Sequence, residues 1–106
     1  MNAYQVNSDK TLLPVGTEVD KTVANSAVAL VTAAQIPAEA KCACITNGAQ
    51  PIMITFDGVT DPVAGTVGAY KTAGQVLWVS RAAIANAKAI RQGGTSSVVH
   101  VSFWTR

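Results

Sequence analysis

The stretch Ser97-Val98-Val99-His100-Val101-Ser102-Phe103-Trp104 has the period of a β-strand. Side chains of an extended chain point alternately to two opposite faces. Val99, Val101 and Phe103 therefore share an apolar face, whereas the opposite face carries His100 and Ser102 and is more polar. This alternation predicts a strand that buries one face in a hydrophobic core.

Other segments predict further strands. Pro51 to Asp57 alternates in the same way, with Ile52, Ile54 and Phe56 expected to face inward. Thr17 to Ala24 predicts a half-solvated strand. Ala27 to Thr32 is almost entirely apolar and predicts a central strand buried on both faces. The remaining candidates are Lys41 to Thr46 and Gln75 to Ser80.

The composition favours sheet over helix. Val, Ile and Thr together supply 31 residues, against 4 Leu and 2 Glu. β-branched side chains are stiff and pack well on a pleated surface. Gly, Pro and Asn-Gly or Asp-Gly pairs interrupt the chain at short intervals, which is typical of a sandwich or barrel. We therefore predict one all-β domain, an antiparallel β-sandwich over residues 17–106, preceded by an N-terminal arm over residues 1–16.

The segment from Ser80 to Gly93 is open to two interpretations. Ser80 is a suitable N-cap and the alanines favour a helix, so the whole of 81–92 can be read as one helix. Its apolar face would be narrow, however. The alternative is a short helical turn at 82–86 followed by a strand at 87–92.

The low charge indicates a protein that associates with other proteins. Charged residues make up 13% of the 106 residues, and the net charge is +2. The basic residues are not clustered, so we expect no nucleic-acid partner. Charge keeps small domains apart in solution, and a core of Ala and Val is thin. We therefore expect an oligomer, a dimer or trimer, or a subunit of a larger assembly.

Neither secretion nor membrane insertion is expected. The first residues lack the cationic and apolar regions of a signal peptide, and the apolar run from Ala27 to Ala34 is too short to cross a bilayer. Cys42 and Cys44 share one face of a strand, about 6.5–7 Å apart, which is outside comfortable disulfide reach. We interpret them as small buried hydrophobic residues in a reducing compartment.

No reaction centre is recognisable, so we expect a protein that is not an enzyme and uses no metal or cofactor. His100 is the only histidine, and its strand pattern favours a solvated or interface position over a catalytic one. Glu18 and Asp20 share a strand face and could form an acid–base pair, but a solvated face is favoured. Trp104 is open to two interpretations, an exposed interface anchor or a core residue, and Tyr70 is the second candidate interface residue.

Three segments carry a resemblance to a known family. They run from Asn25 to Thr46, from Pro51 through Asp57-Gly58 and Pro62 to Gly68, and from Asn86 to Arg91 followed by Val98 to Phe103. Over about residues 25–103 this order resembles small virion structural proteins of tailed bacteriophages, in which a strand ends in an Asp-Gly turn and a Pro. In this chain the loop is longer, and Val63 follows Pro62.

The resemblance implies a jelly-roll β-sandwich that is incorporated into the virion, after assembly in the bacterial cytoplasm, without catalysis. It also implies that Asp57, Gly58, Pro62 and Gly68 form a structural turn motif. The leading hypothesis is a capsid decoration or cement protein, with itself and the major capsid protein or another virion protein as partners. The alternative is a ligand- or carbohydrate-binding module of a phage neck, head fibre or tail.

Overall fold

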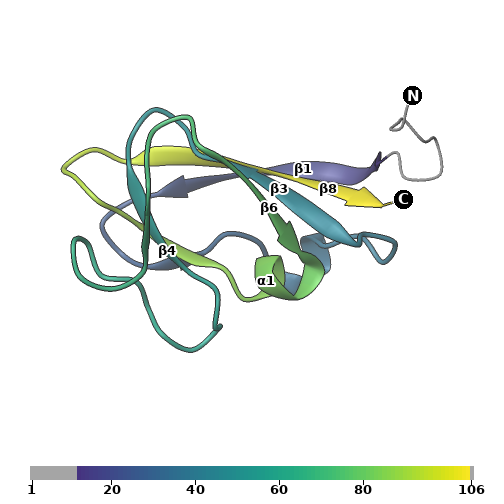
Figure 1. Ribbon diagram of the computed structural model, residues 1–106, viewed down its shortest axis with the longest axis horizontal. Helices are drawn as coiled ribbons and strands as arrows, with labels where there is room; N and C mark the ends of the chain where they lie inside the picture. Colours follow the sequence, from purple (N-terminus) through teal and green to yellow (C-terminus); the bar gives the residue numbers. More distant parts are fainter. Residues whose placement is uncertain (1–11, 106) are drawn as a thin grey trace, which may run out of the picture.

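The computed structural model describes residues 12–105. These residues form eight β-strands, one 3-10 turn and one short α-helix (Figure 1). The strands are β1 (Leu13–Val23), β2 (Val28–Ala29), β3 (Cys42–Thr46), β4 (Ile52–Thr55), β5 (Ala69–Lys71), β6 (Val76–Ser80), β7 (Lys88–Arg91) and β8 (Ser97–Thr105); the helical elements are η2 (Ala33–Gln35) and α1 (Arg81–Ala85).

The strands form two four-stranded antiparallel sheets. Sheet A has the order β1-β8-β3-β6, and sheet B has the order β2-β7-β4-β5. The first strand pairs with the last, β2 with β7, β3 with β6 and β4 with β5. This nested pairing is the topology of an eight-stranded jelly roll. The predicted all-β sandwich is therefore confirmed, and Figure 1 shows β1, β8, β3 and β6 in one layer with β4 in the other.

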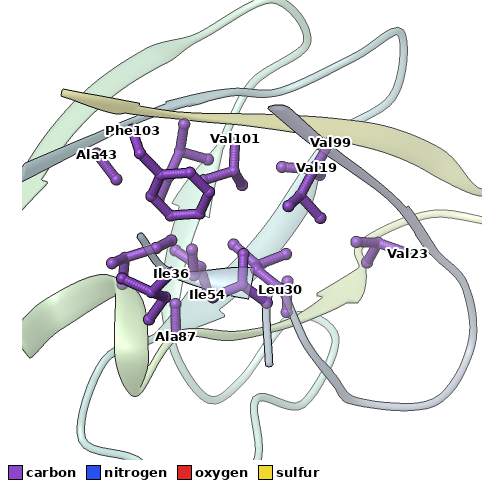
Figure 2. Packing of buried hydrophobic residues seen from close by; sticks show 14 of the residues in the cluster. Val19, Val23, Leu30, Ile36, Ala43, Ile54, Ala87, Val99, Val101 and Phe103 are labelled. Atoms are coloured by element: carbon purple, nitrogen blue, oxygen red, sulfur yellow. The ribbon is translucent and has the colours of Figure 1, made fainter. Parts of the chain in front are cut away.

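The core lies between the two sheets, and the alternation of β8 supplies much of it. Val99 and Val101 are fully buried and Phe103 is 2% exposed, as the period of two predicts. Figure 2 shows these three side chains pointing toward Leu30 and Ile54 from the other side of the sandwich. Ile52 and Ile54 also enter the core as predicted, and Phe56 packs against it.

Two predicted boundaries differ from the structure. Ala27 to Thr32 is not a central strand, because β2 has two residues and lies at the edge of sheet B. After Ala29 the chain bends and carries Leu30 and Val31 into the core outside any strand, so burial there comes without sheet pairing. At the other boundary, β1 begins at Leu13, so residues 13–16 of the predicted arm belong to a strand. Residues 1–11 of that arm lie outside the described residues.

The segment after Ser80 forms a short helix and then a strand. The Ser80 hydroxyl accepts a hydrogen bond from the backbone N–H of Ala83, which caps the first turn of α1. The helix ends at Ala85, and β7 pairs with β4 over Lys88–Arg91. Of the two interpretations of this segment, the short helical turn with a following strand is confirmed. In this arrangement Ile84, Ala87 and Ala89 all enter the core.

A buried polar cluster holds one end of the sandwich together. The Asn47 side chain is 2% exposed, and its Nδ2 donates hydrogen bonds of 2.8 Å to the carbonyl oxygens of Gln50 and Thr72. Its Oδ1 accepts a 2.9 Å hydrogen bond from the buried Ser97 hydroxyl. One amide thus joins the loop after β3, the loop after β5 and the start of β8.

Replacing Asn47 tests this cluster. Asn47→Ala leaves the Ser97 hydroxyl and two carbonyl groups without their partner, so the free energy of unfolding is expected to fall by about 1–3 kcal/mol. Urea unfolding followed by tryptophan fluorescence measures the change. The control is Asn25→Ala, at an exposed position, which is expected to change stability by less than about 0.5 kcal/mol. Equal effects of the two substitutions would contradict the role of Asn47.

Candidate functional site: the exposed face of sheet A

The outward side of sheet A carries both apolar and polar side chains over β3, β6 and β8, and the rest of the described chain leaves it open. Residues of β3, β6 and β8 that alternate with the core residues point to this side and are exposed or half-buried. We call it the tryptophan face. It consists of Cys42, Cys44, Thr46, Val76, Trp78, Ser80, Val98, His100, Ser102 and Trp104.

Two tryptophans meet above the central strand of this face. Trp78 pairs with Cys44 from one side of β3, and Trp104 pairs with Cys42 from the other side. The ring centroids are 5.8 Å apart with an edge-to-face angle of 61°, a favourable aromatic geometry. The Trp104 indole N–H donates to the Ser102 hydroxyl at 2.9 Å. Trp78 nevertheless remains 53% exposed, so its ring offers a large apolar area to a partner.

The cysteines lie beneath these rings and not in the core. Cys42 and Cys44 share one face, as predicted, but they are half-buried, and both are free thiols. The prediction that they are buried is therefore wrong, since both are half-buried. Ala43 and Ile45 occupy the core side of β3 instead. Successive side chains of a strand point to opposite faces, so only one of the two pairs can face the core.

The only histidine lies at the polar end of the tryptophan face. His100 pairs with Asp20 across β8 and β1, and His100 Nδ1 is 2.6 Å from Asp20 Oδ1. Both side chains are about half exposed or more, which agrees with the favoured solvated position. Within residues 12–105 no hydrogen bond joins this pair to a serine or cysteine nucleophile. The pair is thus a cross-strand surface contact.

Glu18 and Asp20 border a shallow groove between β1 and η2. Its volume is about 500 Å³, and Pro37 and Gln35 form the opposite wall. The register of β1 shifts between Val15 and Val19, which places Glu18 in an irregular part of the strand. Asp20 contacts His100, whereas no hydrogen bond between Glu18 and Asp20 is present in the described residues.

The two predicted interface anchors lie on different sheets. Trp104 belongs to the tryptophan face, whereas Tyr70 is in β5 at the far edge of sheet B and is 52% exposed. The structure therefore brings Trp104 together with Trp78 and not with Tyr70. The sequence analysis did not predict that Trp78 and Trp104 meet, although it predicted the strands that carry them. Which residues meet depends on the order of the strands in the sheet, and that order was not predicted.

The Asp57 motif forms the loop between β4 and β5. Asp57 Oδ1 accepts hydrogen bonds from the backbone N–H groups of Val59 at 3.0 Å and Thr60 at 2.8 Å. Pro62 is fully buried, and Asp61 makes a 3.0 Å ion pair with Lys88 of β7. These contacts anchor the loop to sheet B.

Two glycines of the motif have backbone conformations that favour glycine. Gly58 has a φ of 75° and Gly68 a φ of 112°. A Cβ on Gly68 would lie 2.9 Å from the carbonyl oxygen of Ile54 in β4. Gly68 therefore lets the end of the loop lie directly against the core strand.

Alanine substitutions separate this requirement from a general effect of loop changes. Gly68→Ala is expected to lower the free energy of unfolding by about 1–3 kcal/mol, because it adds backbone strain and a close contact. Gly93→Ala is the control, since a Cβ there meets open space, and it is expected to be neutral within about 0.5 kcal/mol. Chemical denaturation of both variants measures the difference. A neutral Gly68→Ala would show that the loop does not depend on this close approach.

Acid titration tests the Asp57 turn. Hydrogen bonds from the Thr60 side chain and from the backbone N–H groups of Val59 and Thr60 lower the Asp57 pKa from 3.8 to about 2. A lowered pKa in the folded state stabilises the fold above pH 3.8, and this contribution disappears as the pH falls toward 2. The stability difference between wild type and Asp57→Ala is therefore expected to shrink between about pH 4 and pH 2. A stability difference that stays constant down to pH 2 would contradict the hydrogen bonds to the Asp57 carboxylate.

Comparison with known proteins identifies no relative. No family model, no curated protein and no solved structure matches the chain. Among residues 12–105 no group of three or more His, Cys, Asp or Glu side chains is placed to hold a metal ion. No helix in the described part of the chain is long and apolar enough to span a membrane. The tryptophan face is the candidate site on which a functional proposal rests.

Proposed function

We propose that this protein is a non-enzymatic structural protein of a bacteriophage virion, a capsid decoration or cement subunit. It self-associates as a dimer or trimer and binds the major capsid protein or another virion protein. It joins the particle in the bacterial cytoplasm and stabilises it through protein–protein contacts. The observation that carries the proposal is the tryptophan face, an exposed sheet surface on which Trp78 and Trp104 meet.

The topology supports this proposal. Jelly rolls of eight strands are common in viral capsid proteins, and they are also found in lectins and cupins. The nested pairing of β1 with β8 through β4 with β5 is that topology. A fold alone does not imply function, so the support comes from the combination of this topology with the surface that it presents.

The surface chemistry is that of a protein interface. Aromatic residues are enriched in interfaces, and tryptophan is frequent among the residues that contribute most binding energy. Three of the exposed large apolar side chains, Val76, Trp78 and Val98, lie on the tryptophan face. With many copies on one particle, contacts that are individually weak add up to strong attachment. A 10.9 kDa subunit can therefore reinforce a much larger shell.

The carbohydrate-binding alternative predicts an aromatic platform made by Trp78, Trp104 and Tyr70. Trp78 is exposed enough to contact a sugar, but Trp78 and Trp104 meet edge to face at 61° and Tyr70 lies on the other sheet. The three rings do not form one continuous platform. Binding on a glycan array that is lost in Trp104→Ala would favour this alternative over the virion proposal.

Reconstitution with particles tests the proposed function directly. Particles produced without this protein are mixed with purified protein, and the bound fraction and the temperature of particle disruption are measured. Wild type is expected to bind in many copies and to raise that temperature. Combined Trp78→Ala and Trp104→Ala substitutions are expected to reduce affinity at least about tenfold, because truncation of an interface anchor costs more than about 1.4 kcal/mol.

The matched control is Val59→Ala, which removes an apolar side chain that is 82% exposed in the β4–β5 loop. Its binding is expected to equal that of wild type. Absence of the wild-type protein from purified particles, or full binding by the double tryptophan variant, would contradict the proposal.

A further inference from the structure

The four edge strands of the sandwich differ in how they are protected from pairing. An unprotected edge presents free N–H and C=O groups to any other strand, and proteins block such edges with short strands, prolines, bulges or charges. The edges of sheet B are short, because β2 has two residues and β5 has three. In sheet A, β1 carries Pro14, a register shift and the charged residues Glu18, Asp20 and Lys21.

Strand β6 has none of these protective features. Its sequence, Val76-Leu77-Trp78-Val79-Ser80, contains no charge and no proline. Its five residues pair with β3 without a register shift. In Figure 1 it lies beside β3 at the border of its layer. The sequence therefore leaves one edge open and blocks the other three.

Hydrogen bonds to β3 show which backbone groups of β6 are free. The N–H of Asn47 donates to the carbonyl of Gln75, and the N–H of Arg81 donates to the carbonyl of Lys41. Bonding alternates along an antiparallel strand, so residues 77 and 79 also face β3. The backbone groups of Val76 and Trp78 and the N–H of Ser80 therefore face away from the sheet.

We infer that β6 pairs antiparallel with β6 of a second copy of this chain, around a two-fold axis at Trp78. This contact specifies how the self-association in the proposed function takes place, and in that respect the inference rests on the proposed function. Trp78 of each copy exchanges N–H···O=C bonds with Trp78 of the other. The N–H of Ser80 donates to the carbonyl of the partner's Val76, and the two-fold axis repeats this bond from the partner's Ser80 to Val76. Sheet A of one copy and sheet A of the other thus join into one continuous sheet.

A second copy fits this edge because an antiparallel pair of identical strands is self-complementary. With the axis at Trp78, Val76 lies opposite the partner's Ser80 and Leu77 opposite the partner's Val79. No like charges oppose each other: Arg81 lies opposite the partner's Gln75. The guanidinium of Arg81 is also held by the carbonyl groups of Pro37 and Ala40 of its own chain.

The pairing also enlarges the tryptophan face. The two Trp78 side chains lie on the same side of the joined sheet, and aromatic cross-strand pairs stabilise a sheet. Each Trp78 already contacts Trp104 of its own chain. The dimer thus presents four tryptophans on one continuous surface, which a single subunit cannot do.

Charge substitutions at Trp78 test the contact on purified protein. Sedimentation velocity over a concentration series is expected to show a wild-type dimer. Trp78→Lys and Trp78→Glu each place like charges opposite one another, and each is expected to weaken the dimer at least about 30-fold, the effect of losing about 2 kcal/mol. An equimolar mixture of the two variants is expected to restore a dimer, because opposite charges then face each other.

Val98→Lys is the matched control, because Val98 is exposed on the same face but lies on β8, an internal strand. This variant is expected to dimerise like wild type, and circular dichroism checks that every variant is folded. A monomeric or trimeric wild type, or a mixture of the Lys and Glu variants that stays monomeric, would overturn the inference. A dimer that fails to bind particles would refute the proposed function and leave this contact intact.

Discussion

Strand β8 pairs with β1 on one side and with β3 on the other, and this double pairing determines the orientation of every side chain in sheet A. Because side chains alternate, a slip of one residue would exchange the core set for the outer set on each strand. Burying Val99, Val101 and Phe103 prevents that slip. The same constraint places His100 and Trp104 outside, so the core and the exposed face have one cause.

The surface that remains open after folding follows from this arrangement. One face of each sheet is buried in the core. The outer face of sheet A carries two tryptophans with few charged neighbours. Exposed apolar surface of this kind is typical of binding sites in proteins that are otherwise stable. The unprotected β6 edge adjoins the same surface, since Trp78 belongs to both. Assembly through β6 and attachment through the tryptophan face are therefore compatible, and neither requires the fold to change.

Local sequence predicted the elements whose signals are local. The alternation of β8, the inward positions of Ile52 and Ile54 in β4 and the N-cap at Ser80 depend on neighbouring residues, and each lies as expected or as one of two stated alternatives. Features that depend on strand order were missed. The meeting of Trp78 and Trp104 above Cys42 and Cys44 requires β6, β3 and β8 to be adjacent, although 26 positions in the sequence separate the two tryptophans. The short β2 was also missed, because an apolar run does not show whether burial comes from a sheet or from a bend.

We propose that this jelly roll binds a second copy through β6 and binds the particle through the tryptophan face. The decisive measurement is hydrogen–deuterium exchange, which reports the protection of backbone N–H groups, compared between protein diluted until it is monomeric and particle-bound protein. The peptide covering 76–80 is expected to be strongly protected in the bound state relative to the monomer, because pairing of β6 covers its outward N–H groups, while the peptide covering 57–68 exchanges at an unchanged rate. Unchanged exchange over 76–80, together with new protection of the 57–68 loop or of β5, would show that the contacts lie elsewhere on the molecule.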